Sequence, residues 1–89
     1  SSLHFRNMAK LKNLNLHSNR IEHFNESAFQ NLNSLVALDL TNNKLQAIKS
    51  FYFVGLYNLR VLYLGENEIS FVEKGSLLNL SKLSMLYIY

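Results

Sequence analysis

The amino-acid sequence predicts a solenoid of the α/β class. We expect a right-handed superhelix with short parallel strands on its concave face and irregular or short helical segments on its convex face. Three observations support this. Apolar residues recur every 24 residues along the chain, each repeat holds a short segment in which leucine alternates with other residues, and an asparagine follows that segment. Because one repeat cannot bury its own apolar side, neighbouring repeats must stack.

The repeat divides the 89 residues into consecutive stretches, which we treat as one domain. They are residues 1–10, the back half of a repeat; 11–34, 35–58 and 59–82, three complete repeats; and 83–89, the start of a fourth. The leucine that opens each repeat forms the column Leu11, Leu35, Leu59 and Leu83. A period kept over so many positions indicates one architecture throughout the chain.

Each repeat contains a segment with the alternation of a short strand. In the first repeat, Leu14 and Leu16 point to one face and Asn15 points to the other. The equivalent segments are residues 38–40 and 62–64. We expect these segments to stack as a parallel sheet that has its leucines inside the coil and the intervening side chains on the concave surface.

Two further columns predict how the coils are held together. One is the asparagine column Asn19, Asn43 and Asn67, whose amides we expect to satisfy backbone groups of neighbouring coils in a ladder. The other is the later column Phe5, Phe29, Phe53 and Leu77, which we expect to fill the wider, outer side of the coil.

The combined pattern L-x-x-L-x-L-x-x-N-x-L is carried by residues 11–21, 35–45 and 59–69. The chain therefore resembles the leucine-rich-repeat family over essentially its whole length. Its 24-residue repeat with a late phenylalanine resembles the typical subclass, common in Toll-like receptor ectodomains and secreted insect immune proteins. This resemblance implies an extracellular location. Secreted members carry cysteine-rich caps, which are absent here, so we expect an uncapped internal segment of a longer protein.

Composition argues against several other classes of protein. The chain has no cysteine, so it has neither a disulfide framework nor a thiolate metal site. No apolar run reaches the roughly 18 residues of a membrane helix, and we expect no membrane contact from this segment. The net charge of +3 is mild and its basic residues are scattered, which argues against nucleic acid as the partner.

The residue pattern predicts no enzyme, no metal site and no cofactor. His17, Ser18 and Asp39 fall on or beside adjacent predicted strands, but a sheet surface offers neither a deep pocket nor an oxyanion site. A polar contact between strands is the simpler interpretation. The three histidines, His4, His17 and His23, fall in different columns and lack the spacing of metal ligands.

The outward positions of the strands are the candidate binding surface. The candidate ligand-binding residues are Asn15, His17, Asp39, Val61, Tyr63, Met85, Tyr87 and Tyr89. The set begins polar and becomes apolar and rich in tyrosine, which is the composition of a binding hot spot. The alternative interpretation is that tyrosine and valine are present because they favour strands.

Two sequons, Asn25–Ser27 and Asn79–Ser81, make Asn25 and Asn79 candidates for N-glycosylation. Both lie away from the predicted strands, so sugars there would leave the concave face free. This placement is compatible with secretion.

These observations predict a non-enzymatic module of an extracellular receptor or secreted innate-immune protein. It would bind a protein or another macromolecular ligand through its concave strand face. One alternative is a structural scaffold of a secreted or matrix protein that forms a homo- or heterodimer. Another is the ectodomain of a nucleic-acid-sensing receptor that uses scattered basic residues such as Lys12, Arg20, Lys44 and Arg60.

Overall fold

The structure is a computed structural model that describes residues 10–26, 28–30, 32–78 and 80–88. Its strands are β1 (Asn13–Asn15), β2 (Ala37–Asp39), β3 (Ala47–Ile48), β4 (Val61–Tyr63), β5 (Phe71–Val72) and β6 (Met85–Tyr87). No helix occurs within these described ranges, so the described part of the coil outside the main sheet is built from irregular turns and the short strands β3 and β5. In the described part of the chain, no helix is long and apolar enough to cross a membrane.

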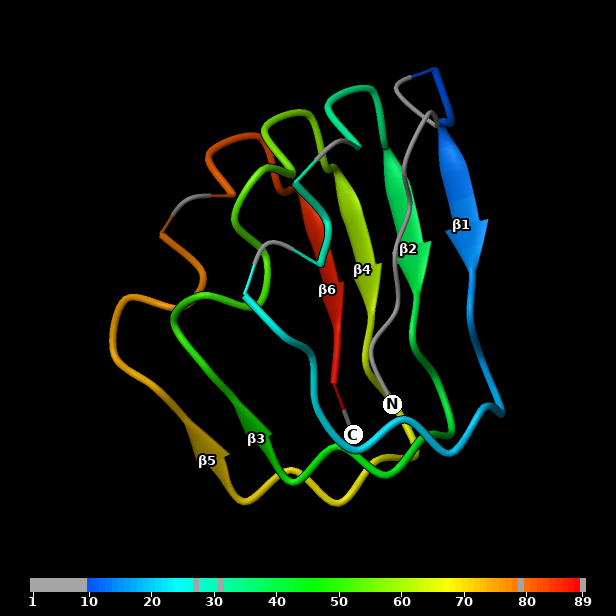
Figure 1. Ribbon diagram of the computed structural model, residues 1–89, viewed down its shortest axis with the longest axis vertical. Helices are drawn as coiled ribbons and strands as arrows, with labels where there is room; N and C mark the ends of the chain where they lie inside the picture. Colours follow the sequence, from blue (N-terminus) through cyan, green and yellow to red (C-terminus); the bar gives the residue numbers. More distant parts are fainter. Residues whose placement is uncertain (1–9, 27, 31, 79, 89) are drawn as a thin grey trace.

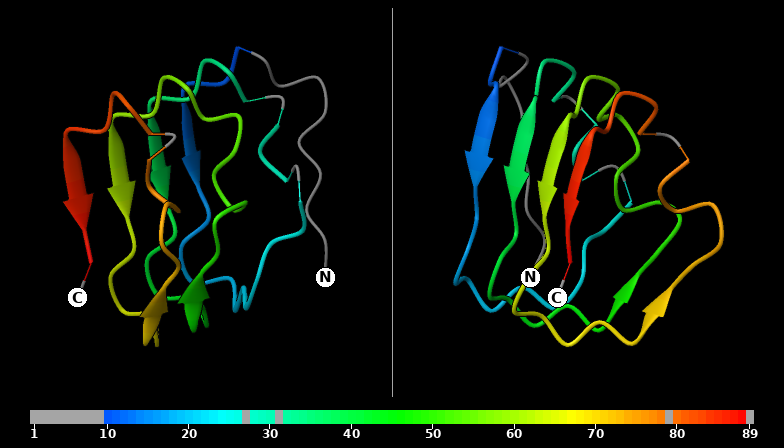
Figure 2. Two further views of the ribbon diagram at one scale, coloured as in Figure 1. Left: turned by 90° about the vertical axis from the view of Figure 1, so that its left-hand side faces the viewer. Right: turned by 180° about the vertical axis from the view of Figure 1, so that it is seen from behind.

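Four strands form a parallel sheet in the order β1-β2-β4-β6. Each strand pairs with its counterpart one repeat away, so Leu38 lies between Leu14 and Leu62. Figure 1 shows the four strands side by side, with each coil returning past the far side before the next strand begins. There, β3 and β5 form a second, two-stranded parallel sheet. The views in Figure 2 show the coils stacked in chain order, which confirms the predicted solenoid.

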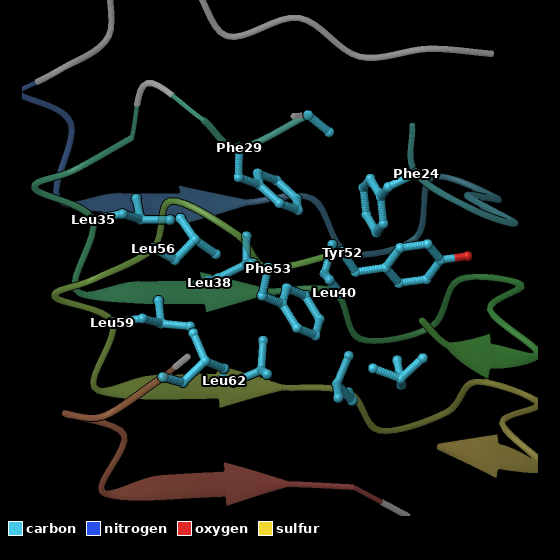
Figure 3. Packing of buried hydrophobic residues seen from close by; sticks show 14 of the residues in the cluster. Phe24, Phe29, Leu35, Leu38, Leu40, Tyr52, Phe53, Leu56, Leu59 and Leu62 are labelled. Atoms are coloured by element: carbon cyan, nitrogen blue, oxygen red, sulfur yellow. The ribbon is translucent and has the colours of Figure 1, made fainter. Parts of the chain in front are cut away.

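The hydrophobic core lies between the four-stranded sheet and the turns that face it. Leu38 and Leu62, which point inward from β2 and β4, have no exposed surface. Figure 3 shows Phe29 and Phe53 in the same core. Their rings are stacked, with centroids 6.3 Å apart. Complete burial of a side chain of this size stabilises the fold by about 1.5–3 kcal/mol. Packing between coils is therefore the main source of stability.

Asn43 connects two neighbouring coils through its buried side-chain amide. Its Oδ1 accepts hydrogen bonds from the backbone N–H groups of Asn19, at 3.0 Å, and Ile21, at 2.9 Å. Its Nδ2 donates to the carbonyl oxygens of Leu16, at 3.0 Å, and Leu40, at 2.9 Å. The Asn43 side chain is only 4 % exposed, so these bonds satisfy polar groups that water does not reach.

Asn67 makes the equivalent contacts one coil later. Its Oδ1 accepts from the backbone N–H of Leu45 at 3.1 Å, and its Nδ2 donates to the carbonyl oxygens of Leu40 and Leu64, both at 3.0 Å. Asparagine serves this position because its side chain carries both an acceptor and a two-proton donor. The same residue type thus satisfies the same backbone groups in successive turns.

Aromatic rings fill the side of the coil that lies opposite the main sheet. Tyr52 is 3 % exposed, and its ring lies edge-on to Phe24 at a centroid distance of 5.4 Å. Burial raises the pKa of Tyr52, and a hydrogen bond with the Phe24 backbone opposes part of this rise. This tyrosine hydroxyl is therefore accommodated in its neutral form.

Candidate ligand-binding face

The concave face consists of the outward-pointing residues of β1, β2, β4 and β6. Strand register arranges these residues in two columns that cross the sheet. The first column is Asn13, Ala37, Val61 and Met85. The second column is Asn15, Asp39, Tyr63 and Tyr87. Both columns become more apolar towards β6, so the described candidate residues of these strands share one surface with a polar end and an aromatic end.

The aromatic end is organised by a stacked pair of tyrosines. The rings of Tyr63 and Tyr87 have centroids 4.9 Å apart and planes only 8° from parallel. Neighbouring strands of a sheet are themselves about 4.7–4.9 Å apart, so each ring stands over its own strand with its faces turned along the solenoid axis. The two side chains remain 36 % and 37 % exposed, respectively. The pair presents rigid, amphipathic surface to the solvent.

The polar end is organised by side chains that bond to their own backbone. Asn15 Oδ1 accepts from the backbone N–H of His17 at 3.1 Å, and Asp39 Oδ1 accepts from that of Thr41 at 2.9 Å. In both cases the side-chain oxygen bonds to the backbone two residues later, which is a turn that Asn and Asp favour. The same turn therefore ends β1 and β2. The residue at the equivalent position in β4 is Tyr63, whose side chain stacks on Tyr87 instead.

Polar residues form the rim where the chain leaves the sheet. Ser18, Asn42 and Glu66 occupy equivalent places in successive coils, with positive φ angles of 61°, 58° and 57°. Asn42 Nδ2 donates to Ser18 Oγ at 3.0 Å. Asparagine adopts this left-handed conformation more readily than serine or glutamate. The turn is repeated in each coil because it redirects the chain away from the sheet.

Comparison with known proteins agrees with this geometry. Residues 2–45 and 35–88 each match the family model described as leucine rich repeat. The chain belongs to the leucine-rich-repeat family. Together, the two matches include almost all of its residues, and the four strands of the main sheet lie within them.

A solved structure similar to this leucine-rich-repeat chain is the crystal structure of a TLR13–ssRNA13 complex. The two chains are 29 % identical, with a TM-score of 0.83. The match covers 88 % of this chain and 11 % of that chain. The chain thus spans a small part of the length of the protein it resembles. Among curated proteins, none matches it.

The residues considered for catalysis in this leucine-rich-repeat chain do not form a relay. His17 Nδ1 lies 3.1 Å from Ser18 Oγ, but the Asp39 carboxylate bonds to the Thr41 backbone. Within the described residues, no hydrogen bond joins His17 to Asp39. Nor do the described histidines and carboxylates include a group of three that could hold a metal ion. His17 and Ser18 thus contact each other at the surface, and Asp39 does not join them among the described residues.

Two of the predicted positions, Tyr89 and Asn79, lie outside the described residues. Asn25 is exposed and directly follows the buried Phe24, on the side of the leucine-rich repeats away from the four-stranded sheet. A sugar on Asn25 would therefore point away from the concave face.

The last described leucine-rich coil carries several exposed apolar side chains, of which sequence reasoning singled out Met85 alone. Its exposed apolar side chains are Phe71, Val72, Leu78, Met85, Leu86 and Ile88. Leu86 and Ile88 belong to columns whose earlier members, Leu62 and Leu64, are buried by the next coil. Their positions in the repeat, taken alone, predicted that Leu86 and Ile88 would be buried. They are exposed because no described coil covers β6.

A hollow of about 340 Å³ also lies on this coil, lined by residues 72–78. Ser76 Oγ is buried there and has no hydrogen-bond partner among the described residues. The lining includes no strand of the main sheet, so the hollow is separate from the concave face. Sequence gave no signal for it, because Ser76 shares a column with Ala28 and Tyr52, which are ordinary core residues.

Proposed function

We propose that this leucine-rich-repeat chain is a non-enzymatic recognition module that binds a protein ligand through its concave face. The observation that carries the proposal is the exposed, parallel stack of Tyr63 and Tyr87, bordered by Val61 and Met85. Rigid aromatic side chains expose large contact area and lose little conformational entropy when they bind. The polar end beside the stack supplies hydrogen-bonding groups that add specificity.

We infer that this module belongs to an extracellular or endosomal receptor ectodomain, or to a secreted innate-immune protein. Support comes from the 24-residue repeat and from the similarity to the TLR13 structure. The exposed Asn25 and the second sequon at Asn79 are proposed sites of N-glycosylation. Absence of glycan at both sites in protein recovered from its native source, together with a cytosolic location, would contradict this setting.

The concave-face proposal is tested with Tyr63→Ala combined with Tyr87→Ala. The affinity of the double variant is measured by surface plasmon resonance against a partner isolated with the wild-type chain. Truncation of a hot-spot residue costs about 2 kcal/mol or more, so we expect Kd to rise at least roughly thirtyfold. Tyr57→Ala is the matched control, because Tyr57 is exposed in a turn away from the main sheet.

Circular dichroism of the tyrosine variants separates loss of binding from loss of folding. A folded double variant that keeps the wild-type Kd would place recognition elsewhere in the protein. A loss of binding in the Tyr57→Ala control would move the binding surface to the turns.

Single-stranded nucleic acid is a second candidate ligand, favoured by the TLR13 structure being described as a complex with ssRNA13. Tyrosine rings also provide platforms on which bases stack. However, the charged residue within the described strands of the main sheet is Asp39, which repels phosphate. Binding of a single-stranded RNA oligonucleotide with steep weakening as salt is raised would favour this candidate. The absence of such binding would favour a protein as the ligand.

Self-association is a third candidate, in which the stack of Tyr63 and Tyr87 would contact the same stack of a second copy. The two tyrosines are 36 % and 37 % exposed, so their surface is accessible to another chain. Analytical ultracentrifugation that finds a monomer at all concentrations would exclude this role.

A further inference from the structure

The boundary between the polar and aromatic ends of the concave face is one pair of residues. Asp39 of β2 and Tyr63 of β4 are direct register partners in the parallel sheet. Although the chain has a net charge of +3, the formally charged side chain within the described strands of the main sheet is an acid, Asp39. The local charge is thus opposite to that of the whole chain.

The Asp39 carboxylate is held in place by only one of its oxygens. Oδ1 accepts the backbone N–H of Thr41 at 2.9 Å, which holds the side chain in position on the sheet. Oδ2 receives no hydrogen bond from the described residues, and no ion pair involves Asp39 within them. The residue is half-buried. A carboxylate oxygen in this environment is available to a donor from outside the chain.

The Tyr63 ring has one face against Tyr87, and its other face lies on the side of β2. Its stack with Tyr87 of β6 uses the first face, at 4.9 Å and 8°. Because β4 lies between β2 and β6, the opposite face is turned toward β2. The strand spacing of about 4.7–4.9 Å places the Asp39 position beside that face. The faces of an aromatic ring carry partial negative charge.

We propose that the Asp39 carboxylate and the adjoining face of Tyr63 form a subsite for an arginine side chain of the protein partner. A guanidinium group can lie flat against a tyrosine ring while its N–H groups donate to a carboxylate oxygen. The Tyr87 ring supports Tyr63 from the other side. This inference rests on the proposed function, and it specifies the chemistry that the concave face recognises.

The subsite is tested by nuclear magnetic resonance on the full chain, titrated with N-acetyl-arginine-N-methylamide. N-acetyl-citrulline-N-methylamide is the matched probe, because it has nearly the same shape and no charge. We expect a saturable shift of the Tyr63 ring resonances with the arginine probe. With the citrulline probe, we expect an affinity roughly three- to tenfold weaker, since exposed cation–π and ion-pair contacts are each modest.

Asp39→Asn removes the charge and preserves the turn, because Asn15 already makes the same turn in the preceding coil at 3.1 Å. We expect Asp39→Asn and Tyr63→Leu each to weaken the arginine probe roughly threefold or more. Glu22→Gln is the control. It removes one exposed carboxylate outside the strands and is expected to leave the affinity unchanged.

Equal binding of the two probes, or wild-type affinity in Asp39→Asn, would overturn the subsite. An equal loss in Glu22→Gln would overturn it too, because the effect would then be one of overall charge. If the tyrosine double variant loses partner binding while Asp39→Asn keeps it, the proposed function stands and the arginine subsite fails. If the arginine probe binds as expected but the tyrosine double variant binds its partner normally, the proposed function fails instead.

Discussion

The concave side and the opposite side of this solenoid connect neighbouring coils in different ways. On the concave side, regular backbone pairing joins β1, β2, β4 and β6, and the outward side chains take no part in it. On the opposite side, the described residues outside β3 and β5 form irregular turns. Aromatic rings pack these turns against one another. There, packing between side chains makes much of the contact between neighbouring coils.

This difference separates the residues that build the fold from those whose side chains can differ from coil to coil. Outward concave positions change from Asn15 to Asp39 to Tyr63 while the backbone register stays the same. Buried residues such as Phe29 and Phe53 contact each other across coils and are constrained by shape. We therefore expect concave substitutions to affect binding more than stability, and substitutions on the opposite side to affect stability.

The largest expected effect is a difference in the loss of stability when two adjacent residues of β4 are each replaced by alanine. Leu62→Ala empties a fully buried position and should lower the free energy of unfolding by about 2–5 kcal/mol. Tyr63→Ala removes a half-exposed ring and should lower it less; its stacking contact with Tyr87 contributes about 0.5–1.5 kcal/mol of that loss. Urea denaturation of both variants measures the difference. Similar losses would show that the outward side chains also hold the coils together.

An intermediate effect is expected at a close approach between turns. Gly55 has a φ of +102°, and an added Cβ would lie 2.9 Å from Gln30 Cα and 3.0 Å from the Phe29 carbonyl oxygen. Gly55→Ala should therefore destabilise the fold by about 1–3 kcal/mol.

Gly75→Ala is the matched control for Gly55→Ala. Gly75 also has a positive φ, of +83°, but the nearest atom to its added Cβ is Leu78 Cδ1 at 3.8 Å. We expect a loss of about 1 kcal/mol from the backbone alone. If thermal melts give equal losses for the two variants, the close contact between coils contributes nothing.

The smallest expected effect is a pH dependence at Tyr52. Because burial raises the pKa of Tyr52 above that of the unfolded chain, its contribution to stability is complete below about pH 10. That contribution is lost as pH rises through the folded-state pKa. Tyr52→Phe should reduce this alkaline loss, and at neutral pH should cost about 1 kcal/mol for the hydrogen bond. The control is Tyr57→Phe, at an exposed tyrosine. Its free energy of unfolding, measured by urea denaturation between pH 8 and 11, should depend on pH as in the wild type.

Much of the concave side could be predicted from sequence because its spacing is regular. The alternation of Leu14, Asn15 and Leu16 identified a strand and the side chain that faces outward, and the 24-residue period identified its partners. A parallel sheet of identical repeats has one register that aligns every buried column, since a shift of one residue would expose the leucines. The candidate strand residues from Asn15 to Tyr87 followed from the same pattern.

Only the tertiary structure decided how the side chains at these positions are used. Sequence placed Tyr63 and Tyr87 in one column but left their ring orientation open, and left open whether Asp39 would contact His17 or its own backbone. Exposure of Leu86 was likewise not visible in its column. A repeating sequence determines which positions face inward, because burial follows from the period. It does not determine side-chain rotamers or coverage at the last coil, because these depend on contacts made after the coils have stacked.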